Sequence, residues 1–122
     1  TRAEYHMMRR HNSYYVGKFG DMDIVGFKSL FGHSHGTGAA LFDTVKGVGR
    51  DGEEGSGEGF RRGGLMATYL IGPLLILNPP LCKWLLREMG APSDTLAFEE
   101  TSMDSYRERV AEFMEPGRSW KY

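Results

Sequence analysis

The sequence has only one cysteine, no long apolar run and almost no net charge. Because Cys82 alone cannot form an internal disulfide, we expect a reducing compartment and hence a cytoplasmic protein. The longest apolar stretch, residues 70–77, is too short to cross a bilayer. Fifteen basic residues against sixteen acidic ones leave no basic surplus for nucleic acid or an anionic membrane surface. We therefore expect neither of these as a partner.

Strand patterns dominate the first part of the chain. Aromatic and β-branched residues flank Gly20-Asp21, which predicts an antiparallel hairpin over about 12–28. Residues 24–27 are continuously apolar, so this strand should be covered on both faces. A second strand candidate spans 65–71, and a shorter one spans about 41–45.

Helical patterns appear only in the C-terminal part. Asn78 before two prolines can begin a helix over 79–89, and Gly90 lies where that helix would end. Apolar residues at spacings of three and four predict another helix over about 96–114. The whole chain, 1–122, is therefore expected to form one α/β unit with two C-terminal helices.

Two Gly-rich segments, 31–38 and 47–59, are predicted to be flexible surface loops. The first contains His33 and His35, which are too few ligands for zinc, so we expect no metal. The second begins with GVGRDG, the glycine spacing of a dinucleotide-binding loop. Its acidic, Gly-rich continuation cannot form the helix that such a loop needs, so we expect no cofactor.

Residues 65–81, LMATYLIGPLLILNPPL, form the most distinctive stretch. Its Thr-Tyr-Leu, Gly-Pro-Leu-Leu and Asn-Pro groups resemble the signature of class I glutamine amidotransferase domains of the cobyric acid synthase type. The resemblance is greatest to the glutaminase subunits of lipid II isoglutaminyl synthase. Residues 23–27, DIVGF, look like the strand that enters the family's Gly-Phe-Glu motif, and the matches together span about 14–114 in the family's order.

The resemblance implies the C-terminal half of a doubly wound, flavodoxin-like glutamine amidotransferase domain. The N-terminal half of that domain, with its nucleophilic cysteine, would lie upstream of this sequence. Without that half, the apolar side chains of the two main strands should lack neighbours, namely Ile24, Val25, Phe27, Met66, Tyr69 and Leu70.

Two positions depart from the family's motifs. The catalytic histidine of the family falls on Ile71, and an isoleucine cannot accept a proton. Lys28 replaces the glutamate of the Gly-Phe-Glu motif. The departures predict an amidotransferase-like protein that no longer hydrolyses glutamine but retains a pocket for an amide or amino acid. The candidates for lining that pocket are Lys28, Ser29, Tyr69 and Gly72.

Two alternatives remain open at this point. The chain could belong to an active amidotransferase that supplies ammonia for amidation in cobalamin or cell-wall precursor synthesis. Its base would then be His33 or His35, the only histidines in the Gly-rich loop. The other alternative is a structural or interaction subunit whose partner is a synthetase-like ligase.

Overall fold

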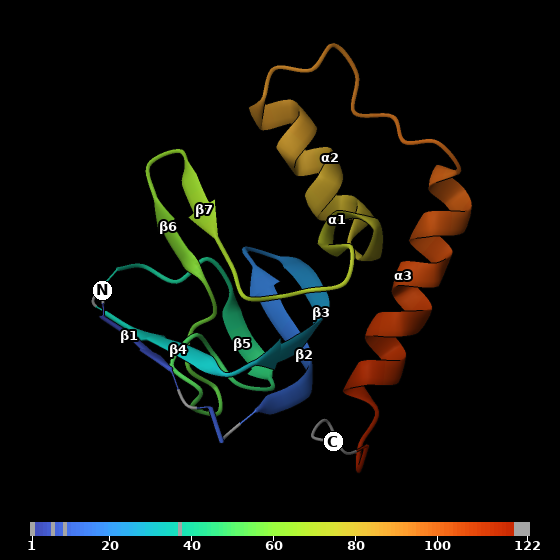
Figure 1. The fold of residues 1–122 in the computed structure, drawn as a ribbon. Helices are drawn as coiled ribbons and strands as arrows, with labels where there is room; N and C mark the ends of the chain where they lie inside the picture. Colours follow the sequence, from blue (N-terminus) through green and yellow to red (C-terminus); the bar gives the residue numbers. More distant parts are fainter. Residues whose placement is uncertain (1, 6, 9, 37, 119–122) are drawn as a thin grey trace.

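The computed structural model of the chain describes residues 2–5, 7–8, 10–36 and 38–118 (Figure 1). Over these residues the strands are β1 (Arg2–Tyr5), β2 (His11–Phe19), β3 (Met22–Leu30), β4 (Gly32–His35), β5 (Asp43–Lys46), β6 (Phe60–Arg62) and β7 (Leu65–Ala67). The helices are α1 (Leu74–Leu77), α2 (Pro79–Glu88) and α3 (Glu99–Met114).

The predicted hairpin is confirmed and forms the centre of the fold. Strands β2 and β3 pair antiparallel from His11–Leu30 to Phe19–Met22, with Gly20-Asp21 as the turn between them. Gly20 has a φ of +58°, which an L side chain adopts only at a steric cost. Strand β5 joins the free side of β2, so the order of this sheet is β3-β2-β5.

Both faces of this sheet are covered, as the apolar run at 24–27 predicts. Val16 and Val25 point toward α3, where Tyr106 and Phe113 complete one core cluster. On the opposite face Tyr15, Ile24, Phe42, Leu70 and Leu81 form a second cluster, to which α1 and α2 contribute. Figure 1 shows α3 along one side of the sheet and the short helices at its end.

The expectation that the strand side chains lack neighbours is wrong for four of them. Ile24 and Val25 are 0% exposed and Leu70 is 7% exposed. Phe27, which was expected to be uncovered as well, packs its ring against that of Phe113. The cause is tertiary, since α3 and the segment around 70–85 supply the cover that the sequence pattern did not reveal.

The two helix predictions are confirmed, with small shifts at their ends. Helix α2 ends at Glu88, and α3 begins at Glu99 rather than near 96. Tyr106 of α3 donates a hydrogen bond to the backbone oxygen of Asp23 at 2.8 Å, which ties the helix to the hairpin. The four-residue helix α1 was not expected, because an apolar run this short carries no period.

Several strands differ from the sequence predictions. The segment expected as a loop over 31–38 contains β4, which pairs antiparallel with β1. Strand β7 pairs with β6 but ends at Ala67, and the predicted strand 65–71 is therefore shorter. It ends there because Tyr69 and Ile71 donate their N–H groups to Glu58 and to the Phe27 carbonyl instead of to β6.

The fold is a mixture of helices with small antiparallel sheets. Every strand pair among the described residues is antiparallel, so the parallel sheet of a doubly wound domain does not occur within them. In this part of the chain no helix combines the length and the apolar character needed to span a membrane.

The outer edge of β3 is paired by the Ile71 backbone at Phe27 and by the Asn78 side chain at Val25. The Asn78 amide is fully buried, accepts a hydrogen bond from Val25 N–H at 2.8 Å, and donates one to the Val25 carbonyl at 2.8 Å. It thus pairs with β3 as a neighbouring strand would. A second bond from the amide to the Leu74 carbonyl at 2.7 Å connects this edge to α1.

We expect Asn78→Ala to lower the free energy of unfolding by about 2–4 kcal/mol, because both backbone groups of Val25 lose their buried partner. Urea unfolding followed by circular dichroism measures this change. Asn12→Ala is the matched control, since Asn12 bonds only Ser29 at the half-buried surface, and it should cost under about 1 kcal/mol. Equal losses in the two variants would contradict the role of Asn78.

Candidate functional site

The Gly-rich segment 47–59 is packed against β3, and the expectation of a flexible surface connection is wrong. Val48 is 2% exposed and Glu58 is 0% exposed. Backbone hydrogen bonds cross the segment, from Gly49 N–H to the Glu53 carbonyl at 3.0 Å and from Arg50 N–H to the Gly57 carbonyl at 3.0 Å. The glycines allow this close folding, and the chain here forms a compact loop beside the sheet.

A buried ion pair joins this loop to β3. The Lys28 ammonium lies 2.5 Å from a Glu58 carboxylate oxygen, and both side chains are almost inaccessible to solvent. Lys28 also donates to the carbonyls of Val48 at 3.1 Å and Gly49 at 2.6 Å. These three bonds use all three N–H groups of the ammonium. Burial lowers the pKa of Lys28 from its usual value, and the Glu58 carboxylate opposes that shift.

The second carboxylate oxygen of Glu58 holds the start of the amidotransferase-like signature. It accepts hydrogen bonds from the Thr68 hydroxyl at 2.8 Å and from Tyr69 N–H at 2.7 Å. The Lys28 ammonium in turn lies 5.9 Å from the centre of the Tyr69 ring. Lys28 and Glu58 therefore position Tyr69, although they contribute no free polar group for a ligand.

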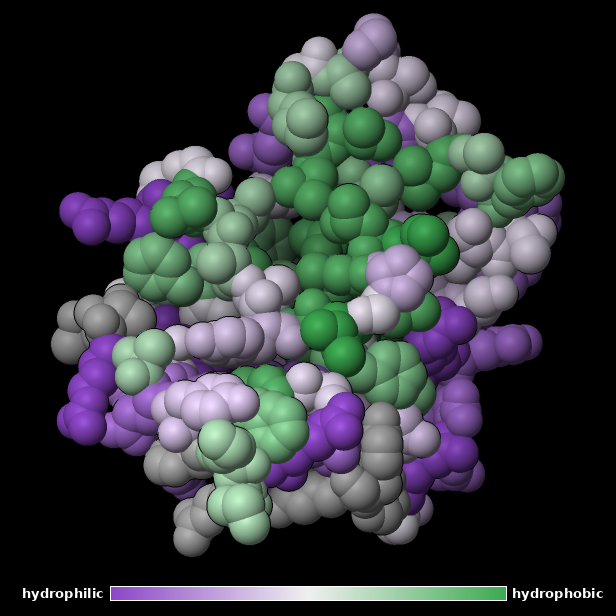
Figure 2. Space-filling model, viewed as in Figure 1, coloured by the Kyte–Doolittle hydropathy of each residue, from purple (hydrophilic) through white to green (hydrophobic). Residues whose placement is uncertain are grey.

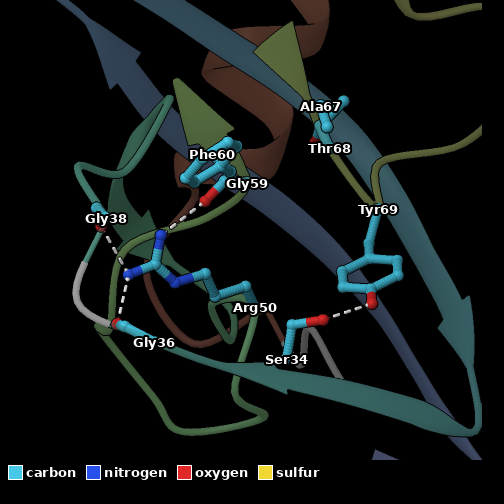
Figure 3. Close-up of a pocket in the computed structure, with 9 residues that line it drawn as sticks. All are labelled: Ser34, Gly36, Gly38, Arg50, Gly59, Phe60, Ala67, Thr68 and Tyr69. Atoms are coloured by element: carbon cyan, nitrogen blue, oxygen red, sulfur yellow. Dashed lines mark hydrogen bonds between the residues drawn. The ribbon is translucent and has the colours of Figure 1, made fainter. Parts of the chain in front are cut away.

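A cavity of about 270 Å³ opens beside Tyr69 (Figure 3). Its walls come from β4, the 47–59 loop and the β6–β7 hairpin, and include Ser34, Arg50, Phe60 and Thr68. The Tyr69 and Ser34 hydroxyls point toward each other and are hydrogen-bonded at 2.5 Å. This contact brings the histidine-containing segment and the signature segment together.

The Arg50 side chain connects backbone segments at the wall of the cavity. Its guanidinium donates to the carbonyls of Gly59 at 2.9 Å, Gly36 at 3.0 Å and Gly38 at 2.7 Å. The neighbouring Asp51 carboxylate accepts from the Ser56 hydroxyl and closes the loop upon itself. Partial burial alone would raise the pKa of Asp51, but its hydrogen bonds outweigh this effect and hold the pKa below the usual value.

The two histidines lie on the other face of β4 from the cavity. Side chains alternate along a strand, so His33 and His35 point away from the face that carries Ser34. The His33 ring packs against Gly52, where an added Cβ would come within 2.6 Å of it. His35 lies 3.4 Å from the Glu4 carboxylate and is exposed.

The other candidates are dispersed. Ser29 follows Lys28 on the opposite face of β3, where it donates to Asn12 and accepts from Arg10.

Gly72 takes a φ of +73° in the turn after Ile71, close to the Phe27 ring. The Ile71 backbone pairs with Phe27, and its side chain is 49% exposed. Of the four predicted pocket residues, only Tyr69 lines the cavity.

Sequence reasoning missed Arg50, Glu58 and Ser34 as site residues. One available signal was that Arg50 is the single basic residue of an otherwise acidic loop. Another was the replacement of the family's glutamate by Lys28, because a buried cation requires an acidic partner elsewhere in the chain. Among the described residues no group of three His, Cys, Asp or Glu side chains lies close enough together to hold a metal ion.

Comparison with protein-family models finds no match to this chain, and comparison with curated proteins finds none either. The resemblance to glutamine amidotransferases therefore remains an expectation from the sequence motifs.

We expect Lys28→Met and Glu58→Gln each to lower the free energy of unfolding by about 3–5 kcal/mol, because each leaves one buried charge unpaired. The double variant should cost less than the sum of the two, as it removes both charges. Urea unfolding of all three variants measures the coupling between the two residues.

The matched control is the half-exposed pair Lys18–Asp23, in which Lys18→Met and Asp23→Asn should each cost under about 1 kcal/mol. Additive losses in the Lys28→Met/Glu58→Gln double variant would contradict a coupled buried pair.

Proposed function

We propose that this chain belongs to a cytoplasmic amidotransferase-like protein that does not hydrolyse glutamine. The observation that carries the proposal is Ile71, a half-exposed apolar side chain at the position of the family's histidine. Leu70 lies in the core, Gly72 makes the positive-φ turn and Asn78 closes β3. The position of the family's histidine thus presents an outward-facing apolar side chain that cannot accept a proton.

The chemical reason is the loss of a base. Hydrolysis of an amide by a thiol requires a group that takes the thiol proton and later returns it to the leaving amine. The isoleucine side chain can do neither. Removing the base from comparable catalytic groups lowers rates by roughly 10⁴-fold or more.

The finer fold forms part of the same proposal. The chain would supply the C-terminal half of a doubly wound, flavodoxin-like domain, and the other half would bring the parallel strands and the nucleophile. Leu75 and Ile76 of α1 are 42% and 75% exposed, which leaves an apolar surface for the protein partner considered below. Figure 2 shows hydrophobic residues gathered over the upper central surface, where α1 and α2 lie in Figure 1.

Ammonia release from glutamine by the full-length protein tests the lost activity. We expect no release by the wild type above the buffer rate, and a measurable gain in Ile71→His. Ile76→His is the matched control, since it places the same group on another exposed isoleucine, and it should gain nothing. Robust ammonia release by the wild type would overturn the proposal.

The same assay tests the alternative of an active enzyme with a relocated base. The orientation of β4 supports the non-hydrolysing interpretation, because His33 and His35 point away from the face that carries Ser34 and the cavity. We expect His33→Ala and His35→Ala to leave the wild-type rate unchanged. An active wild type that loses turnover in either variant would establish the alternative.

A synthetase-like ligase is the partner that the resemblance implies, and the exposed side chains of α1 are a suitable contact for it. Gel filtration of the full-length protein with the ligase encoded by a neighbouring gene measures co-elution. We expect the wild type and Met89→Asp to co-elute with the ligase and Ile76→Asp to elute alone, both sites being more than 70% exposed. Co-elution of Ile76→Asp would remove α1 from the interface.

A further inference from the structure

We propose that the cavity beside Arg50 binds a small monocarboxylate with an apolar, ring-sized body. This inference goes beyond the proposed function and does not depend on it, because Ile71 does not line the cavity and no hydrolysis is involved. The argument rests on the charge of Arg50, on a pair of hydroxyls and on the apolar walls around them.

The guanidinium of Arg50 is a cation at the cavity wall that pairs with no carboxylate among the described residues. Its hydrogen bonds go to the neutral carbonyls of Gly36, Gly38 and Gly59. These bonds use three of its five N–H groups and fix its orientation, while its charge stays uncompensated by any of them. A carboxylate that enters the cavity would supply the missing counter-charge through a charge-assisted hydrogen bond.

The Ser34–Tyr69 pair offers the second polar contact. Two hydroxyls that share one hydrogen bond use one of their two hydrogens, and the other hydrogen is available to an acceptor. The Thr68 hydroxyl offers a ligand no further donor, since it donates to Glu58 and accepts from Leu70 N–H. The cavity therefore combines one cation with one hydroxyl donor, which suits an oxygen-bearing anion.

The remaining walls are apolar and set the size of the ligand. Phe60 packs directly on the backbone of Gly38, where an added Cβ would come within 2.4 Å of the ring. The Phe60 ring and the Ala67 methyl group lie on the side of the cavity opposite Ser34 (Figure 3). A volume of about 270 Å³ is near the lower limit of small-molecule sites, which favours a body of about one ring.

The acidic loop restricts the ligand to a single negative charge. Asp51, Glu53 and Glu54 lie in the same loop as Arg50, and they would repel a phosphate dianion or a nucleotide. Lys28, the cation beside Tyr69, is already paired with Glu58. A carboxylate with one charge balances Arg50 without this repulsion.

Benzoate and its neutral near-isostere benzamide test the proposal by isothermal titration with the full-length protein. We expect benzoate to bind saturably and benzamide to bind at least tenfold more weakly, because only benzoate pairs with Arg50. Glutamine and glutamate are titrated in the same way. Both should bind more weakly than benzoate, since neither has an apolar body. Equal binding of benzoate and benzamide, or no saturable benzoate binding, would overturn the proposal and leave Arg50 as a clamp between loops.

Three variants place the binding in this cavity. Arg50→Ala should abolish benzoate binding, while Arg107→Ala, an exposed arginine of α3, should leave it unchanged. Because Arg50→Ala also removes three structural hydrogen bonds, Ala67→Phe serves as a second variant that fills the cavity and keeps those bonds. Circular dichroism confirms folding in each case. Benzoate affinity unchanged in a folded Ala67→Phe would contradict this site, whatever the glutaminase assay yields.

Discussion

The buried ion pair between Lys28 and Glu58 is the interaction on which the site depends. It lies between β3, the 47–59 loop and the segment that begins at Thr68: the Glu58 carboxylate accepts from Lys28 and Thr68, and Lys28 also donates to the Gly49 carbonyl of the loop. Removing two charges from water is costly, and the structure offsets this cost with hydrogen bonds to both groups. The paths of the loop and of Tyr69 follow from this arrangement, and so does the position of Arg50.

Several residues of the 65–81 segment have structural roles in the fold. Thr68 and Tyr69 bond to Glu58, Leu70 enters the core, and Asn78 pairs with the edge of β3. Such residues would be retained for stability even in a protein without catalysis. At Ile71 the backbone is paired with Phe27 while the side chain faces outward.

The two chemical features of the molecule lie on different parts of the same segment. Tyr69 turns toward β4 and the cavity, whereas Ile71 pairs along β3 and precedes the exposed apolar helix α1. A ligand at Arg50 and a protein partner at α1 would accordingly contact two neighbouring parts of the segment 69–76. Binding at one end has a direct covalent route to the other through Leu70 and Gly72.

The sequence by itself determined the elements whose signals are local. The hairpin around Gly20-Asp21 and the helices α2 and α3 follow from turn residues and apolar spacing, and both their type and their approximate bounds were predictable. Ile71 in the motif was also readable, since a motif is a property of neighbouring residues. These features depend on interactions within a few positions along the chain.

Only the tertiary structure decided the packing of the 47–59 loop, the pairing of β4 with β1 and the cavity. Ser34 and Tyr69 are 35 positions apart, and Lys28 and Glu58 are 30 apart. A composition rich in glycine and acid is equally compatible with a flexible loop and with a compact one. The compact form of the 47–59 loop follows from Lys28 on the distant strand β3. The buried charge of Lys28 needs the Glu58 carboxylate as its partner, and the loop brings Glu58 to it.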